Sequence, residues 1–196
     1  MINVGDKVPD AEVQIIRDGA PTAVQMSELL GSGQVVLFAV PGAFTPVCSE
    51  QHLPSFLETA SELTESGVDR ILCLGVNDAF VLHGWGMSHS VGSTITMVGD
   101  PHAAFTKAIA MEVDATSAGL GVRSMRYALV AEDGIVTAFF PEDDGFDLVA
   151  STGQNVLKVV IDHERRQRQV DDLVNSDFFS SVQDQAAVLR KASEDS

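Results

Sequence analysis

The sequence predicts an α/β domain with a mixed central β-sheet flanked by helices, and two observations support this prediction. Short apolar runs typical of buried strands alternate along the chain with stretches of helical periodicity. Later in the chain, two strand-like segments, 126–131 and 134–140, flank the turn sequence Glu-Asp-Gly, which predicts an antiparallel hairpin. Strands connected by helices, with a hairpin at one side, form a mixed sheet covered by helices.

Local patterns predict each element in chain order. Residues 1–34 combine Gly and Pro with short alternating stretches, which predict short strands and turns with one helical turn at 27–30. Beyond them we expect a buried strand at 35–40, a helix from Thr45 to about Ser66, a buried strand at 70–76, a helix over 78–86, a short strand at 96–98, a helix around 102–109, the hairpin, and a helix from Thr152 onward. This order is thioredoxin-like in layout.

Composition excludes several classes of function. The chain has 196 residues and a formal net charge of −16, with 28 acidic against 12 basic side chains. General nucleic-acid binding and attraction to anionic membranes need an excess of Lys and Arg, so neither is expected. No apolar run approaches the roughly 20 residues of a membrane span, and the N-terminal sequence does not resemble a signal peptide. We therefore expect a cytoplasmic protein.

The character of the sequence changes near Asp162. Residues 163–169 are strongly charged, and the residues after them are helical in composition. We predict one domain over 1–161, followed by an acidic, helical extension over 162–196 that is not an independent domain.

The cysteines direct attention to reactivity. Cys48 and Cys73 are the two cysteines of the chain, too few for a disulfide-stabilised secreted fold. The histidines form no ligand-like cluster with them, so no metal site is predicted. The glycines do not form a dinucleotide-binding fingerprint, and no cofactor is expected.

The segment around Cys48 carries the chemistry. Thr45 followed by Pro46 is a helix-start signal, because Thr caps a helix and Pro at the first position loses no hydrogen bond. Cys48 then lies in the first turn, where free N–H groups and the helix dipole favour a thiolate over a thiol. Pro54 should bend this helix. Its predicted apolar face consists of Leu53, Phe56, Leu57, Ala60 and Leu63.

A cysteine in this setting has two interpretations. Free cysteines are often small buried core residues, and Cys48 could be one of them. The helix-start signal directly after a buried strand favours a reactive Cys48 instead.

The same segment resembles the signature of the peroxiredoxin family, Pro-x-x-x-Thr-x-x-Cys, here Pro41, Thr45 and Cys48. The fuller string PGAFTPVCSEQHLPSF resembles the type II, or peroxiredoxin-five-like, branch. Further segments similar to that branch follow in the expected order: GVNDAFV at 75–81, WG at 85–86, GD at 99–100, FTKA at 105–108 and GLGVRSMRYA at 119–128. The likeness covers about residues 1–161.

The resemblance implies a thioredoxin-like fold and the reduction of hydrogen peroxide and organic hydroperoxides. Cys48 would be the peroxidatic thiolate, which becomes a sulfenic acid. Thr45 would hydrogen-bond the peroxide and the thiolate, and Pro41 would shield the site from water. Arg126 would stabilise the thiolate and the charge developing on the oxygens, together with backbone N–H groups near Val47 and Cys48.

Simpler roles compete with several of these assignments. Thr45 could be only a helix cap. Arg126 could be a surface cation on a strand, and without the resemblance nothing would favour it over Arg123. His52, one helical turn after Cys48, could pair with the thiolate or shape the rim of the pocket. Phe44 is a candidate for the pocket wall or for a dimer contact.

The resemblance also bears on regeneration and assembly. Some relatives carry a second, resolving cysteine late in the chain, but Ala150 occupies that place here, so none is predicted. Cys73 lies in the apolar run RILCLGV and is interpreted as a buried structural thiol. These points imply a one-cysteine cycle in which glutathione with glutaredoxin, or alternatively thioredoxin, reduces Cys48. A homodimer packed around the active-site loop and the region of Phe80 and Trp85 is expected.

Other functions remain possible on sequence grounds. A disulfide oxidoreductase of the same fold is disfavoured because the chain has no Cys-x-x-Cys motif. A redox sensor or holdase would need the same activated cysteine and differs only in lacking sustained turnover. A catalytically silent structural subunit is a further alternative.

Overall fold

The computed structural model of the protein describes residues 1–174. The chain divides into two compact units, of which the first spans Met1–Val159 and the second begins at Val160. The division into a domain at 1–161 and an extension at 162–196 remains a prediction. The helical character expected for residues 175–196 lies outside the described part of the chain.

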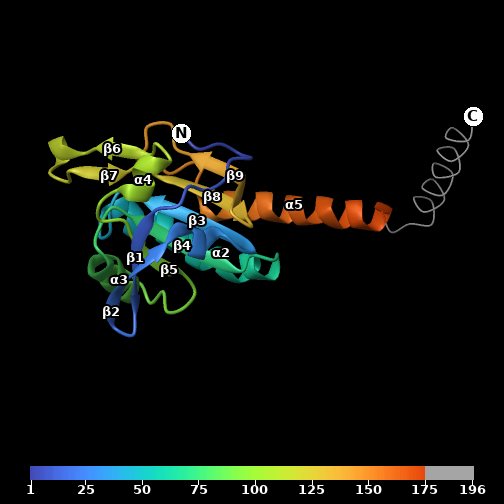
Figure 1. The fold of residues 1–196 in the computed structure, drawn as a ribbon, viewed down its shortest axis with the longest axis horizontal. Helices are drawn as coiled ribbons and strands as arrows, with labels where there is room; N and C mark the ends of the chain where they lie inside the picture. The colour runs from blue at the N-terminus through green and yellow to red at the C-terminus, as the bar shows by residue number, and fades with distance from the viewer. Residues whose placement is uncertain (175–196) are drawn as a thin grey trace, which may run out of the picture. The chain divides into compact units, whose positions relative to one another are not determined.

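Within the described residues, seven strands form the main sheet of the first unit, in the order β2-β1-β5-β4-β3-β8-β9 (Figure 1). These strands are β1 (Glu12–Arg17), β2 (Ala20–Gln25), β3 (Gln34–Val40), β4 (Arg70–Gly75), β5 (Thr96–Gly99), β8 (Tyr127–Glu132) and β9 (Ile135–Pro141). β3, β4 and β5 pair in parallel, whereas the other pairs of neighbouring strands are antiparallel. The predicted fold class, with its mixed sheet and its hairpin, is confirmed.

Side chains alternate across the sheet, so each face of β3 meets different helices. Leu37 belongs to a core cluster that includes Leu30 and Phe105 from two of the helices. The next residue, Phe38, stacks on the ring of Phe56 with 4.0 Å between centroids. The helices are α1 (Met26–Leu30), α2 (Leu53–Glu65), α3 (Ala79–Ser88), α4 (Ala104–Ala108) and α5 (Gly153–Val174). Phe56 lies on α2, so the α2 side of β3 is the side that carries the site described below.

The helix expected from Thr45 to about Ser66 is interrupted by a π-helical turn at Cys48–His52. The N–H of Leu53 donates to the carbonyl of Cys48, five residues earlier. Pro54 lies in the first turn of α2 and has no N–H to donate to the carbonyl four residues before it. Where this bond is missing, the helical turn contains one extra residue. Single π-turns of this kind are common at functional sites.

A small hairpin was not predicted. Strands β6 (Glu112–Asp114) and β7 (Val122–Ser124) pair with each other outside the main sheet and are joined through a short 3₁₀ turn at Thr116–Ala118. Each strand is three residues long, too short for hydrophobic alternation to be recognisable.

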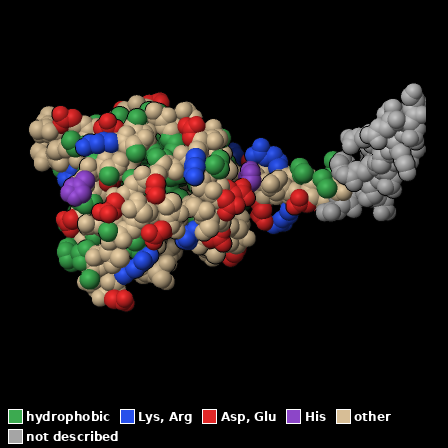
Figure 2. All heavy atoms as spheres, in the orientation of Figure 1, with side chains coloured by type: hydrophobic (Ala, Val, Ile, Leu, Met, Phe, Trp, Pro, Cys, Tyr) green, Lys and Arg blue, Asp and Glu red, His purple; other side chains and the backbone are tan. Residues whose placement is uncertain are grey.

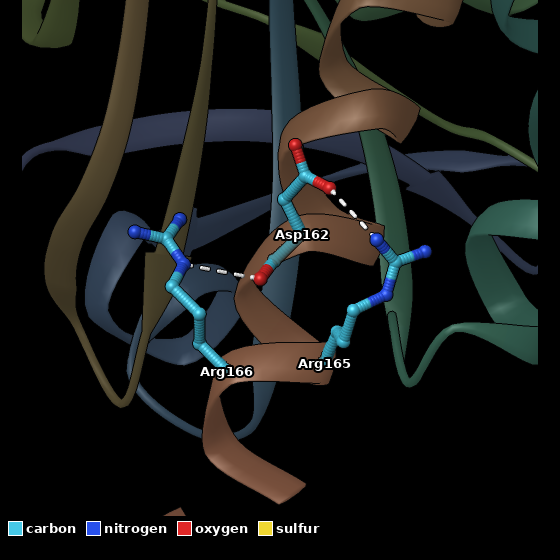
Figure 3. Close-up of polar contacts among 3 residues, drawn as sticks. All are labelled: Asp162, Arg165 and Arg166. Atoms are coloured by element: carbon cyan, nitrogen blue, oxygen red, sulfur yellow. Dashed lines mark hydrogen bonds and ion pairs between the residues drawn. The ribbon is translucent and has the colours of Figure 1, made fainter. Parts of the chain in front are cut away.

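The described part of the second unit is helical and carries local ion pairs. Asp162 accepts a contact of 3.8 Å from Nη1 of Arg165, and its backbone carbonyl accepts a hydrogen bond of 3.1 Å from Nε of Arg166 (Figure 3). Arg168 pairs with Glu164 in the same way, one turn apart. Exposed pairs of this type contribute little to stability.

The surface of the first unit reflects the acidic composition. Asp and Glu side chains are spread widely over the face shown in Figure 2, with fewer Lys and Arg side chains among them. None of the helices in residues 1–174 is long and apolar enough to span a bilayer.

Candidate active site

Cys48 lies at the start of the helical segment that follows β3. Cys48 has no exposed surface, and its sulfur is a free thiol. The N–H of Ser49 bonds to the carbonyl of Thr45 at 3.0 Å and closes the first turn. The N–H groups of Val47 and Cys48 precede that bond and have no acceptor within the helix, which leaves them available to an incoming oxygen. The backbone here can therefore stabilise negative charge.

Arg126 lies far from Cys48 in the sequence, but its side chain contacts the sulfur of Cys48. It precedes β8, is 2 % exposed, and places Nη2 at 3.4 Å from Sγ of Cys48. Nε of Arg126 donates to the carbonyl of Phe146 at 3.0 Å. A buried guanidinium at this distance stabilises negative charge on the sulfur and on an oxygen bound to it.

His52 is neither at the rim of a pocket nor bonded to the sulfur, the two roles considered from the sequence. It is fully buried, and its Nδ1 accepts a hydrogen bond of 3.0 Å from Nη1 of Arg126. Its Nε2 lies 2.9 Å from the carbonyl of Ser151. Because Arg can only donate and a carbonyl can only accept, the imidazole must be neutral with its proton on Nε2. Burial is the main cause that lowers the pKa of His52 to about 3, and the positive charge of Arg126 contributes in the same direction. The hydrogen bond to the Ser151 carbonyl acts in the opposite direction and raises the pKa.

Glu142 organises the segment that contains this carbonyl. The residue is 5 % exposed, and its carboxylate accepts four hydrogen bonds from Val149, Ala150 and Ser151. Desolvation favours its protonated form, but the hydrogen bonds from Ser151, Ala150 and Val149 outweigh it and hold the pKa of Glu142 below its ordinary value. Glu142 is therefore an ionised, fully paired carboxylate close to the site.

The loop between β3 and Cys48 holds the remaining predicted residues. Pro41 is buried directly after β3, whereas Val47 is half-buried. The hydroxyl of Thr45 donates to the carbonyl of Gly42 at 2.8 Å, so its lone pairs are the groups it can offer to a ligand. Phe44 is 60 % exposed and has a positive φ of 62°, an uncommon backbone conformation for a residue other than glycine.

Two further side chains hold the site in place and were not identified from the sequence. The indole N–H of Trp85 donates to Oγ of Ser49 at 3.0 Å, next to Cys48. Oδ1 of Asn77 accepts from the N–H of Ala43 at 3.2 Å and so ties the loop to the end of β4. The resemblance implies a dimer contact in the region of Phe80 and Trp85; Trp85 itself has no exposed surface, so within that region it can only support neighbouring residues.

The second cysteine is separated from solvent. Cys73 lies at the centre of β4 and has no exposed surface. Burial raises its pKa well above the ordinary value, with the nearby Cys48 contributing in the same direction and Arg126 in the opposite one. Within residues 1–174, no group of three His, Cys, Asp or Glu side chains is placed to hold a metal ion.

The structure thus brings Cys48, Arg126 and His52 together in one buried network and places Thr45 and Pro41 on the adjoining loop. Sequence reasoning did not find Glu142 or Ser151. No local pattern marks them, because their role depends on hydrogen bonds to residues far away in the chain. Chemically, the arrangement can hold a thiolate and stabilise charge on oxygens next to it.

Comparisons with known proteins agree with this chemistry. Residues 3–156 match the family model described as Redoxin. "Peroxiredoxin-2E-2, chloroplastic" from Oryza sativa subsp. japonica is 44% identical over 164 residues, which cover 81% of this chain and 72% of that protein.

Solved structures give the same result. Reduced Prx3 from Vibrio vulnificus, in complex with H₂O₂, is 38% identical, has a TM-score of 0.78, and is matched over 82% of this chain and 99% of that one. The Plasmodium falciparum antioxidant protein, a 1-Cys peroxiredoxin, is 28% identical with a TM-score of 0.75, over 81% and 98% of the two chains. The chain therefore belongs to the peroxiredoxin family of thiol-dependent peroxidases, in its type II branch.

Proposed function

We propose that the protein reduces hydrogen peroxide and alkyl hydroperoxides with Cys48 as the peroxidatic residue. The observation that carries this proposal is the 3.4 Å contact between Nη2 of Arg126 and Sγ of Cys48, in a buried site at the start of a helix. A buried cation contacts the sulfur, and the sulfur lies at a helix start whose first N–H groups have no acceptor within the helix, which is the environment of an activated nucleophile.

In the proposed reaction, the thiolate of Cys48 attacks one oxygen of the peroxide. The S–O bond forms as the O–O bond breaks, Cys48 becomes a sulfenic acid, and the departing oxygen takes a proton to leave as water or alcohol. Arg126 and the N–H groups of Val47 and Cys48 stabilise the charge that develops on the oxygens. Thr45 accepts a hydrogen bond from the peroxide, since its own proton is donated to Gly42. Pro41, Phe44 and Val47 line the approach.

We propose that an external thiol restores Cys48. The first thiol displaces water from the sulfenic acid to form a mixed disulfide, and a second thiol releases the Cys48 thiolate and a small disulfide. Glutathione with glutaredoxin is the proposed reductant, with thioredoxin as the alternative, and no resolving cysteine takes part. The complete burial of Cys73 and the presence of Ala150 at the place of a late cysteine support this cycle. We place it in the cytoplasm, although the rice relative is named as chloroplastic.

A homodimer is also proposed, packed around the active-site loop. Phe44 on that loop is 60 % exposed and Phe80 of α3 is 62 % exposed. The hydrogen bond between Ala43 and Asn77 joins the active-site loop to the segment that precedes α3, so Phe44 and Phe80 lie on connected segments. Phe80→Glu should shift the protein from dimer to monomer in analytical ultracentrifugation, and an unchanged mass would contradict this interface.

Turnover tests the proposed function. Purified protein is mixed with hydrogen peroxide, glutathione, glutaredoxin and a system that recycles the oxidised glutathione, and peroxide consumption is followed. The wild type should consume many equivalents of peroxide per chain, and Cys48→Ser should consume none. If the wild type stops after one equivalent with every reductant, it is a sensor or holdase of the alternative kind.

A further inference from the structure

We propose that Glu142 is a positioning residue for the peroxidase reaction. The carboxylate fixes the segment 149–151, the carbonyl of Ser151 fixes His52, and His52 fixes Arg126 against Cys48. The inference rests on the roles proposed above for Cys48 and Arg126, and it assigns a function to a residue that touches neither the sulfur nor the guanidinium with its side chain.

The first step is the set of hydrogen bonds by which the carboxylate of Glu142 holds the segment 149–151. Oε1 accepts from the N–H of Val149 at 3.0 Å, from the N–H of Ser151 at 2.8 Å and from Oγ of Ser151 at 2.7 Å. Oε2 accepts from the N–H of Ala150 at 3.1 Å. Three consecutive N–H groups therefore converge on one carboxylate, and charge-assisted bonds of this type are about twice as strong as neutral ones.

The second step is that hydrogen bonds hold the start of the segment and direct its carbonyls. The side chain of Val149 is 72 % exposed, so packing does not anchor this residue, whereas Ser151 is fully buried. Nδ2 of Asn155 bonds to the carbonyls of Val149 and Ala150 at 2.8 and 3.2 Å and orients them toward α5. The carbonyl of Ser151 is the next in line, and it meets Nε2 of His52 at 2.9 Å.

The third step is the restraint on Arg126. His52 accepts from Nη1 of Arg126 at 3.0 Å, which leaves Nη2 directed at the sulfur at 3.4 Å. The backbone N–H of Glu142 also donates to the carbonyl of Arg126 at 3.2 Å. Glu142 therefore restrains Arg126 by two independent routes, one through its backbone and one through its carboxylate.

The two groups that connect Glu142 to Arg126, the carbonyl of Ser151 and the imidazole of His52, are both neutral. In residues 1–174, no acidic side chain lies within ion-pair distance of Arg126. A carboxylate bonded directly to the guanidinium would compensate the positive charge that the sulfur and the peroxide oxygens need. Transmitting the restraint through a carbonyl and a neutral imidazole orients Arg126 while its charge remains available to Cys48.

The experiment compares Glu142→Gln with Asp143→Asn. Both variants remove one negative charge from adjacent positions, but the side chain of Asp143 is exposed. The amide introduced by Glu142→Gln would present an N–H₂ group to one of the donors that the carboxylate now accepts from. Stopped-flow oxidation of Cys48 by hydrogen peroxide should slow roughly 10- to 100-fold in Glu142→Gln, the scale expected of a misplaced catalytic group, and should stay close to wild type in Asp143→Asn.

A double-mutant cycle separates positioning from general destabilisation. If Glu142 acts through Arg126, Glu142→Gln should have little further effect in a protein that already carries Arg126→Gln. Equal slowing by Glu142→Gln in both backgrounds would overturn the proposal, as would a wild-type rate in Glu142→Gln. If Arg126→Gln alone reacts as fast as wild type, the role proposed for Arg126 in the reaction is wrong. The positioning role of Glu142, which depends on Arg126, is then wrong as well.

A milder variant keeps the test available if Glu142→Gln does not fold. Ser151→Ala removes one of the four bonds to the carboxylate and leaves the backbone carbonyl in place. It should slow oxidation less than Glu142→Gln would and show the same lack of additivity with Arg126→Gln. In parallel, ¹⁵N spectra of His52 should show the Nε2–H tautomer in the wild type and lose that uniform signature in Ser151→Ala. An unchanged rate together with an unchanged His52 spectrum would contradict the positioning role of Glu142.

Discussion

Arg123 and Arg126 lie three residues apart, and the structure gives them different tasks. Nε of Arg123 donates to the carbonyl of Leu120 at 2.8 Å, and its Nη1 donates to the carbonyl of Val76 at 3.2 Å, so it ties loops together. Arg126 is nearly fully buried and reaches Cys48. Residue type alone did not separate the two, because the distinction depends on which direction each side chain takes from the chain.

Removing the charge of Arg126 should therefore slow the reaction with peroxide. We expect Arg126→Gln to lower the second-order rate of Cys48 oxidation by roughly 100- to 1000-fold, the cost of losing one preorganised charge donor. Stopped-flow fluorescence or competition with a reference peroxidase would measure it. Arg17→Gln, which removes the same charge from an exposed position on β1, should react like the wild type. Equal effects in the two variants would show that only overall charge matters.

His52 should make the stability of the fold depend on pH. Its pKa is lowered from 6.5 to about 3, so the unfolded chain binds a proton between these values that the folded chain does not. The contribution of this neutral imidazole is fully present above pH 6.5 and is lost as the pH falls toward 3. The free energy of unfolding should decrease by about 1.4 kcal/mol for each pH unit in that interval.

Urea titrations at several pH values would measure this slope. His52→Gln cannot take up the proton, so its stability should be lower at pH 7 and flatter between about pH 6.5 and 4 than that of the wild type. Parallel curves for the two proteins would mean that His52 is not the group responsible.

At the scale of elements, the sequence predicted most of the sheet and the position of Cys48. Continuous apolar runs revealed β3 and β4, and the Thr-Pro signal located the helix start. The π-turn at Cys48–His52 was not anticipated, because the effect of Pro54 on a preceding turn depends on how the following helix packs. The network from Glu142 to His52 was equally inaccessible, since hydrogen bonds across long sequence distances leave no local pattern.

The predicted apolar face of α2 is confirmed in part, and the difference gives a test. Leu53, Phe56, Ala60 and Leu63 are buried, whereas Leu57 is only partly covered. Leu63→Ala should lower the free energy of unfolding by about 2–5 kcal/mol, because it opens a cavity under the sheet. Leu57→Ala on the same helix should cost clearly less. Thermal or chemical denaturation would compare them, and equal losses would contradict the burial pattern.

At the scale of the whole molecule, the proposed one-cysteine cycle would distinguish this protein from enzymes that close an internal disulfide. Cys73 sits at the centre of the main sheet without exposed surface, and its raised pKa keeps it protonated. We expect Cys73→Ser to fold normally and to keep near-wild-type turnover with glutathione and glutaredoxin. Loss of turnover in a folded Cys73→Ser protein would show that the second thiol takes part in the cycle.

The most direct test of the central claim is to locate the first oxidised sulfur. Reduced protein is treated with one equivalent of hydrogen peroxide in the presence of dimedone, which traps sulfenic acids, and the adduct is assigned by peptide mass spectrometry. We predict an adduct on Cys48 in the wild type and in Cys73→Ser, formed much faster than on a free thiol, and none in Cys48→Ser. An adduct that forms first on Cys73, or no faster on Cys48 than on glutathione, would contradict it.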